Sequence, residues 1–356
     1  MREFVVTKSE EGLSILKLSR KLLPDAPSSL LHKFIRNKNI ELNGKKTAPN
    51  SPVKSGDKVL FFLSDETYDK LSCRSINPSK PHELKDPQTQ KAGADGFDIQ
   101  KSIVYEDENI ILLNKPAGLL SQGDDKNEVS LNDCLLRYLN YSPEERVIKP
   151  SICNRLDKNT SGLIAGGKSA AGLSELNRGF SGRNFVKTYL TYVCGRAELN
   201  GEYRAYLKKD RANNTALLSS EAKKGYDEIC TGFSANEYLN LHGKAVTLLT
   251  ARLITGKPHQ IRAHLKFLGY PVLGDKKYFD KGSRELSEGL KLKQQLLHSL
   301  SVKFFFDKDS PLYYLNEREF AAPLPEDFNF TGEVHGNMEF KGLKGVYPGG
   351  PYKQDK

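Results

Sequence analysis

The first clear pattern of apolar and polar positions lies near the N-terminus. The segment SLLHKFIRN, residues 29–37, has helical spacing and is expected to be capped by Ser28. Its apolar residues form a single stripe: Leu30, Leu31, Phe34 and Ile35. The basic residues lie off this stripe: Lys33, Arg36 and Lys38. The pattern predicts a short amphipathic helix with one cationic face.

Two strand-like segments follow this helix. IELNG, residues 40–44, indicates a strand that ends in an Asn-Gly turn, and VKSGDKVLFFL, residues 53–63, a turn before a buried strand. Residues 1–71 therefore predict a small α/β domain. Residues 72–100 are polar, contain Pro and Gly, and show no periodicity, so we expect a linker.

Residues 101–322 alternate strand-like and helix-like segments. SIVYEDENIILLNKP, residues 102–116, predicts a hairpin that turns at residues 107–109. Ser130 and Asp133 have the spacing of a capping box at the start of a helix.

Three further segments complete this domain. NFVKTYLTYVCG, residues 184–195, and KAVTLLTARLITG, residues 244–256, are rich in β-branched and aromatic residues, which favour strands. PHQIRAHLKFLG, residues 258–269, predicts a helix opened by Pro258 and closed by Gly269. We expect an α+β fold with a mixed, mainly antiparallel β-sheet flanked by helices and loops. Residues 323–356 are aperiodic and predict a loosely held tail.

Charge adds an indication of the partner. The 356-residue chain has 54 Lys and Arg against 44 Asp and Glu, a net charge of +10 and a pI near 9.1. Residues 1–58 alone have 12 basic against 6 acidic residues. This surplus favours a polyanion, most commonly nucleic acid, although a basic enzyme without such a partner has the same balance.

Several classes of protein do not fit the chain. No apolar run is long enough to span a membrane, and the N-terminus does not resemble a secretory signal. The five cysteines are widely spaced and include no C-x-x-C pair, which favours reduced thiols over disulfides or zinc. We expect a cytoplasmic monomer without a metal site.

Asp157 is the first candidate for chemistry. It lies in NRLDKNTSGL, residues 154–163, a run of turn-forming residues with three interpretations: an ordinary turn, a calcium loop, or an acid held by cations. A calcium loop needs a bidentate Glu at its twelfth position, where this chain has Lys168. The other two interpretations stay open on these residues alone.

Two other segments could supply partners for this acid. The helix predicted at residues 258–269 has one apolar face: Ile261, Leu265 and Leu268. Its opposite face is polar: His259, Arg262 and Lys266. On the strand VKTYL, Lys187 and Tyr189 are two residues apart and share a face. An Arg, a Lys, a Tyr ring and one acid could line a cleft for a flat, hydrogen-bonding ring on a phosphodiester chain.

These motifs resemble those of the RluA-type pseudouridine synthases. NRLDKNTSGL is similar to the family signature H-R-L-D-x-x-T-S-G. The family's other motifs are present in the family's order: NKPAGLL (114–120) comes before this signature, and KTYL (187–190), TGKPHQIRAHLKFLGYPVLGD (255–275) and LLHSLSVKF (296–304) come after it. Residues 1–71 resemble the small RNA-binding domain named after ribosomal protein S-four, through HKFIRNKNIELNG and SGDKVLFFL.

The resemblance implies roles by position. Asp157 would be the catalytic acid, Tyr189 would pack against the target base and act in a proton step, and Arg262 would pair with Asp157. The resemblance further implies that the following residues bind substrate RNA: Arg155, Lys187, Asn114, Lys115, His259, Gln260, Lys33, Arg36 and Lys38. Three residues depart from the family pattern: Asn154 for His, Lys257 for Arg, and Pro258 for Thr.

The implied activity is isomerisation of specific uridines in structured RNA, most of all large-subunit (23S) ribosomal RNA. It is redox-neutral and transfers no external group, so no cofactor is expected. No second carboxylate, as in a glycosidase pair, is expected in these motifs. Transfer RNA is the alternative substrate, and a non-catalytic RNA-binding or ribosome-assembly factor is the alternative from another class.

Overall fold

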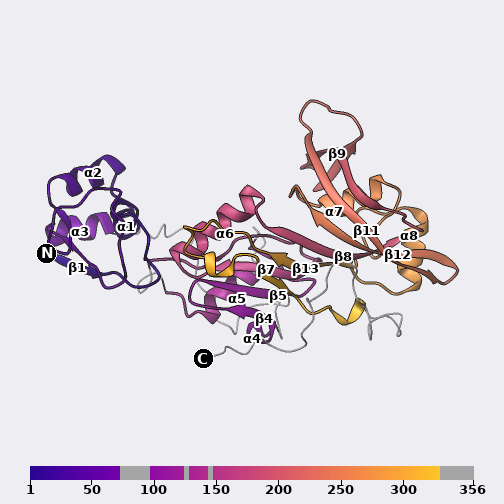
Figure 1. The fold of residues 1–356 in the computed structure, drawn as a ribbon, viewed down its shortest axis with the longest axis horizontal. Coiled ribbons are helices and arrows are strands. Elements are labelled where there is room, and N and C mark those ends of the chain that lie inside the picture. Colours follow the sequence, from indigo (N-terminus) through magenta and orange to yellow (C-terminus); the bar gives the residue numbers. More distant parts are fainter. Residues whose placement is uncertain (73–96, 124–127, 143–146, 329–356) are drawn as a thin grey trace.

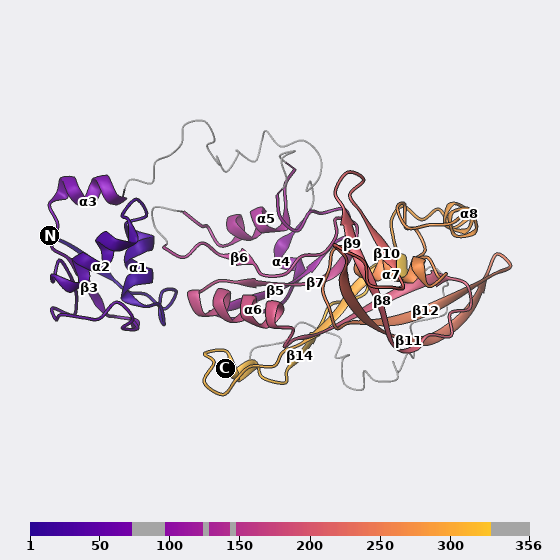
Figure 2. The ribbon, with the colours of Figure 1, turned by 90° about the horizontal axis from the view of Figure 1, so that it is seen from above.

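A computed structural model describes residues 1–72, 97–123, 128–142 and 147–328. The N-terminal domain lies at one end of the molecule in both ribbon views (Figures 1 and 2). Its strands form a three-stranded antiparallel sheet in the order β1-β3-β2. The elements are β1 (Arg2–Val5), α1 (Ile15–Leu22), α2 (Ser28–Arg36), β2 (Ile40–Leu42), β3 (Lys58–Phe61) and α3 (Asp65–Ser72).

Helix α2 forms where the apolar stripe predicted it. Leu31 and Ile35 are fully buried. The three basic residues at 33, 36 and 38 are exposed. The predicted cap is wrong, because Pro27 occupies the N-cap position and the Ser28 hydroxyl instead accepts a hydrogen bond from Arg20, at 2.8 Å. Helix α2 therefore presents a cationic face to solvent.

The second domain is built on an eleven-stranded sheet. Nine of its strands have the order β10-β9-β11-β12-β8-β13-β7-β5-β4, while β14 pairs with β13 and β6 with β7. All described pairings are antiparallel except that of β13 with β7. The predicted α+β fold is confirmed. The elements are α4 (Ile99–Ser102), β4 (Ile103–Glu106), β5 (Ile110–Lys115), α5 (Leu131–Tyr138), β6 (Ser151–Ile152), β7 (Ser161–Gly167), α6 (Ala170–Gly182), β8 (Val186–Cys194), β9 (Asn200–Asp210), β10 (Thr215–Ser219), β11 (Asp227–Leu241), β12 (Lys244–Leu253), α7 (Gln260–Phe267), α8 (Lys281–Gly289), β13 (Leu297–Lys303) and β14 (Glu319–Ala321).

Helices cover both faces of this sheet. Figure 2 shows α5 and α6 on opposite sides of β5 and β7. Strand β8 separates two apolar clusters, because Tyr189 and Val193 face one cluster whereas Leu190 and Tyr192 face the other. The cluster that contains Tyr189 also contains Leu156 and Ile261, which lie beside Asp157 and Arg262 in the chain. This face of the sheet therefore positions the site.

Several predicted elements are confirmed and one is shifted. The 102–116 hairpin forms as β4 and β5, and Ser130 and Asp133 make the expected capping box. The predicted helix at 258–269 begins at Gln260, because His259, with φ 57°, is its left-handed N-cap and Pro258 lies outside it. Helix α7 is also buried on nearly every side.

The domain boundaries differ slightly from those expected. Phe97 and Ile99, placed in the linker, pack against the core of the second domain. Phe328, placed in the tail, is 1% exposed and lies 5.7 Å from Tyr192 between ring centroids. The rest of the predicted linker and tail, residues 73–96 and 329–356, lies outside the described residues.

Strands β7 and β13 approach each other very closely at Gly162. Its φ is +109°, and a Cβ built there would lie 2.2 Å from the carbonyl oxygen of Ser299. Only glycine allows this approach. Since Gly162 follows Asp157 by five residues, the seam between β7 and β13 helps to place the turn that holds the acid.

Two fully buried histidines make stability depend on pH. Burial lowers the pKa of His264 and of His298 to about 4, from an ordinary value of 6.5. The unfolded chain therefore takes up these protons near pH 6.5, whereas the folded chain does so near pH 4. Their contribution to stability, up to roughly 3 kcal/mol each, is complete above pH 6.5 and lost as the pH falls toward 4.

Urea unfolding at pH 7.5 and pH 5 measures this effect. The loss of stability should be smaller in His298→Gln than in the unmodified chain. His32→Gln, at an exposed position, is the matched control and should leave the loss unchanged. Equal losses in all three proteins would contradict the prediction.

No helix in the described ranges is long and apolar enough to cross a lipid bilayer.

Candidate active site

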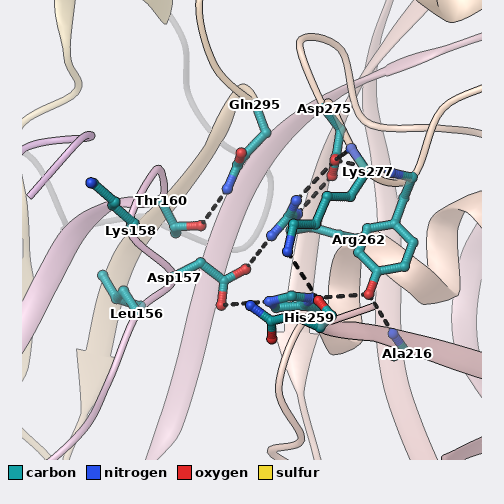
Figure 3. A network of polar contacts seen from close by, with 12 residues as sticks. Leu156, Asp157, Lys158, Thr160, Ala216, His259, Arg262, Asp275, Lys277 and Gln295 are labelled. Carbon is teal, nitrogen blue, oxygen red and sulfur yellow. Dashed lines mark hydrogen bonds and ion pairs between the residues drawn. The ribbon is translucent and has the colours of Figure 1, made fainter. Parts of the chain in front are cut away.

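Asp157 lies in the turn between β6 and β7 (Figure 3). The backbone N–H of Thr160 donates to the Asp157 carbonyl at 3.0 Å. The Ser121 hydroxyl accepts the Leu156 N–H at 3.0 Å and donates to the Leu156 carbonyl at 2.8 Å. The turn interpretation is therefore correct for the backbone, and this turn fixes the carboxylate of Asp157, whose side chain is 25% exposed.

Lys115 supports the same turn from beneath. Its side chain is fully buried, and its ammonium group donates to the carbonyls of Pro116, Leu119 and Lys158 at 2.8–2.9 Å. Burial lowers the pKa of Lys115 to about 7, although the negative charge of Asp157 acts in the opposite direction and raises it. The expectation that Lys115 contacts substrate is wrong, because three backbone carbonyls already occupy its donors.

Arg262 from α7 bridges two carboxylates. Its Nη1 donates to Asp157 Oδ2 at 2.6 Å. On its other edge, Nε and Nη2 donate to Asp275 Oδ2 and Oδ1, at 2.6 and 2.9 Å. The Arg262 side chain is only 6% exposed, so both ion pairs are shielded from water. The bidentate pair fixes the guanidinium plane, and the remaining nitrogen points at Asp157.

Asp275 is a site residue that the sequence did not reveal. Its side chain is fully buried, and its Oδ1 also accepts the backbone N–H groups of Lys277 and Tyr278. Burial opposes its ionisation, but Arg262 and these two donors outweigh burial and lower its pKa. A second carboxylate is therefore present, contrary to expectation, but its lone pairs are committed to the protein. The available signal was its position as the last residue of the 255–275 motif.

His259 approaches Asp157 from the other side. Its Nε2 lies 4.0 Å from Asp157 Oδ1, and its Nδ1 lies 2.9 Å from the hydroxyl of Tyr278. That hydroxyl also accepts the backbone N–H of Ala216, at 2.6 Å. Burial lowers the pKa of His259, which favours the neutral ring. The ring of Tyr278 lies 5.2 Å from the Arg262 guanidinium, so His259 and Arg262 form one connected support around Asp157.

Tyr189 completes the site from β8. It is 6% exposed, and burial raises its pKa to about 12, a rise opposed by the neighbouring Ser299 side chain and assisted by the charge of Asp157. Lys187, on the same face of β8, has a lowered pKa because of burial and of nearby Arg183. Arg155 is exposed and has no ion pair within the described part of the chain. The structure therefore brings together Asp157, Tyr189, His259 and Arg262, with cations near them.

Two expected substrate contacts are not part of the site. Asn114 points to the other face of the sheet and donates to the Pro323 carbonyl at 3.1 Å. Gln260 is 2% exposed, and its amide bonds to Thr255, the Lys257 backbone, and β11. The amide of Gln260 is therefore fully occupied, and Asn114 lies on the face of β5 opposite to the one that carries the Asp157 site.

The departures from the family motifs also have structural partners. The side chain of Asn154 accepts the Ala165 N–H at 2.8 Å, across to β7. Lys257 forms an ion pair with Asp227 at 2.7 Å, so its charge is partly compensated. Among the described residues no cluster of three or more His, Cys, Asp or Glu side chains could hold a metal ion. The chemistry available is that of one accessible carboxylate clamped by an arginine.

Comparisons with known proteins agree with this geometry. A family described as RNA pseudouridylate synthase matches residues 109–267. An uncharacterized RNA pseudouridine synthase of Mycoplasma pneumoniae is 32% identical, over 90% of this chain and 95% of its own. Ribosomal large subunit pseudouridine synthase C of Rickettsia conorii is 30% identical, over 88% of this chain and 94% of its own.

A solved structure shares the fold. Human RNA pseudouridylate synthase domain containing 4 superposes with a TM-score of 0.50 and 20% identity, over 65% of this chain and 92% of that one. Fold and sequence together define an enzyme that converts uridine to pseudouridine in RNA. The chain belongs to the RluA-type family of these pseudouridine synthases.

Proposed function

We propose that the enzyme modifies uridine in large-subunit ribosomal RNA and that Asp157 is its catalytic carboxylate. The observation that carries this proposal is the ion pair between Asp157 Oδ2 and the buried Arg262, at 2.6 Å. It keeps one oxygen of an ionised acid occupied and leaves Oδ1 available. No other carboxylate that the structure describes at this site is free, because Asp275 is fully bonded.

The reaction needs a single ionised acid near the sugar. The bond between N1 of uracil and C1′ breaks, the base turns, and C5 bonds to C1′ while a proton leaves C5 and N1 gains one. Asp157 acts as the nucleophile at C1′ or as the base that accepts a sugar proton as uracil detaches. The isomerisation is redox-neutral and needs no group donor, so these side chains suffice without a cofactor.

Tyr189 supplies the apolar surface for the base. Its pKa of about 12 keeps the phenol protonated at neutral pH, so its ring is uncharged. A uridine must leave its stack to reach Asp157, which costs a few kcal/mol and least in unpaired loops. Stacking on an aromatic ring returns about 1–3 kcal/mol. The preferred target is therefore a uridine in a loop of folded RNA.

Ribosomal RNA is favoured over transfer RNA for two reasons. The Rickettsia relative is named as a large-subunit enzyme and matches this chain across both of its domains. The N-terminal domain presents a basic helix face, which suits the backbone of a large folded RNA. Mapping pseudouridines in ribosomal and transfer RNA from cells that lack the protein tests this proposal. Sites lost only from transfer RNA would identify that RNA as the substrate, and unchanged maps would refute both assignments.

The basic face of α2, together with Lys38 just beyond the end of the helix, should contribute phosphate contacts. Replacing Lys33, Arg36 and Lys38 together by Gln should reduce the magnitude of the slope of log affinity against log salt by about 2–3. Each phosphate contact releases counterions when it forms, and the variant would make up to three fewer such contacts. Filter binding to ribosomal RNA fragments at several salt concentrations measures the slope. The matched control replaces three exposed lysines elsewhere by Gln: Lys281, Lys291 and Lys293. Equal slopes for the two triple variants would contradict a specific role for this face.

A further inference from the structure

The tautomer of His259 follows from its contacts. The Tyr278 hydroxyl accepts the Ala216 N–H at 2.6 Å, and burial raises the pKa of Tyr278 to about 12, so the phenol keeps its proton. That proton needs an acceptor, and His259 Nδ1 lies 2.9 Å away. Nδ1 is therefore the acceptor, and the single ring proton of neutral His259 lies on Nε2.

The Nε2–H group faces the site without a protein acceptor. Its nearest described carboxylate oxygen, Asp157 Oδ1, is 4.0 Å away, beyond hydrogen-bond distance. The ring is held firmly, since His259 has a left-handed backbone and its carbonyl accepts the Ala263 N–H at 3.0 Å. A left-handed conformation at a non-glycine residue costs roughly 1–3 kcal/mol and persists only where surrounding contacts enforce it. The donor is thus preset before substrate binds.

The position of this donor relates it to the departing base. Because Arg262 occupies Oδ2, the sugar of the substrate must meet Asp157 at Oδ1. An atom next to the reacting C1′ therefore lies close to His259 Nε2. When the N1–C1′ bond breaks, its electron pair stays on uracil, and the charge spreads from N1 to O2 and O4. O2 is attached to the carbon next to N1, so it lies nearest the reaction centre.

We infer that His259 is a catalytic residue whose Nε2–H donates a hydrogen bond to O2 of the target uracil and stabilises the detached base anion. This inference rests on the proposed role of Asp157. A preset donor of this kind contributes about 10²–10³-fold to a rate. His259 neither gains nor loses a proton in the step, because a neutral imidazole N–H is a very weak acid. The base therefore stays anionic and can rejoin the sugar through C5.

The test combines variants with altered substrates. Single-turnover rates are measured on one ribosomal RNA fragment with uridine, 2-thiouridine or 4-thiouridine at the target. Sulfur accepts hydrogen bonds weakly, so 2-thiouridine should slow the native enzyme about tenfold more than it slows His259→Phe. The 4-thiouridine substrate should slow both enzymes equally. Equal effects of 2-thiouridine on both enzymes would overturn the contact with O2.

Two further variants separate hydrogen bonding from packing. His259→Gln keeps an N–H donor and should lose less than about tenfold, whereas His259→Phe keeps a ring and should lose about 100-fold. Tyr278→Phe frees Nδ1 and should lose about tenfold, with RNA affinity unchanged in all three. Equal losses in His259→Gln and His259→Phe would overturn the donor role. The native rate on uridine reports separately on the proposed function, since it does not depend on these comparisons.

Discussion

Asp157→Asn is expected to lower the rate of pseudouridine formation by at least about 10⁴-fold, the scale seen when a central catalytic group is removed. The amide has nearly the same size but no charge, so it can neither attack the sugar nor accept its proton. Arg262 would keep a hydrogen bond to the amide oxygen, so the fold should be preserved. Chemical mapping of the modified RNA, or release of tritium from C5, measures the rate.

The matched control for this variant is Asp227→Asn. Asp227 also forms an ion pair with a cation, Lys257, but its side chain is 66% exposed, and it is not one of the carboxylates that Arg262 binds. Its replacement should leave the rate within about twofold, because exposed pairs contribute little. RNA affinity of Asp157→Asn should equal that of the native enzyme. Normal product from Asp157→Asn would refute the catalytic assignment, whereas a native enzyme that forms no product would favour the non-catalytic factor.

Arg262→Met is expected to lose activity and to destabilise the catalytic domain by about 3–5 kcal/mol. The reason is that the fully buried Asp275 would keep its charge with only two backbone donors. Arg262→Lys should recover only part of the loss, since an ammonium cannot hold two carboxylates in one plane. Urea unfolding followed by circular dichroism measures stability, because the chain has no tryptophan for fluorescence.

A double variant tests the cause of this loss. Arg262→Met with Asp275→Asn removes the stranded charge, so it should be more stable than Arg262→Met alone. Residues that share one network show coupling energies of about 0.5–3 kcal/mol. If the losses of the two single variants simply add, the bridge between Arg262 and Asp275 does not stabilise the domain as described.

Local structure was predictable because its causes are local. The hairpin of β4 and β5, the strands β8 and β12, and the capping box at Ser130 all depend on neighbouring residues. The pairing of Asp157 with Arg262 spans 105 positions and was implied only by the family motifs. Side-chain periodicity cannot reveal such a contact.

Burial caused most of the errors. The family resemblance implied that Lys115 binds substrate, yet three carbonyls from two loops enclose its ammonium group, and a buried lysine is rare. The expectation for Asn114 conflicted with strand alternation, because Asn114 and Lys115 are successive residues of β5 and point to opposite faces of the sheet.

The seam between β7 and β13 has a consequence for partly assembled molecules. Asp157 precedes β7, whereas Arg262 and Asp275 come from the segment between β12 and β13, and Gly162 permits the two strands to close. The small N-terminal domain has its own apolar core, and its proposed phosphate contacts do not require that closure. On the proposed function, a chain in which this closure has not formed would bind RNA without modifying any uridine. Incomplete folding would therefore leave the target uridine unmodified and would not produce pseudouridine at a wrong position.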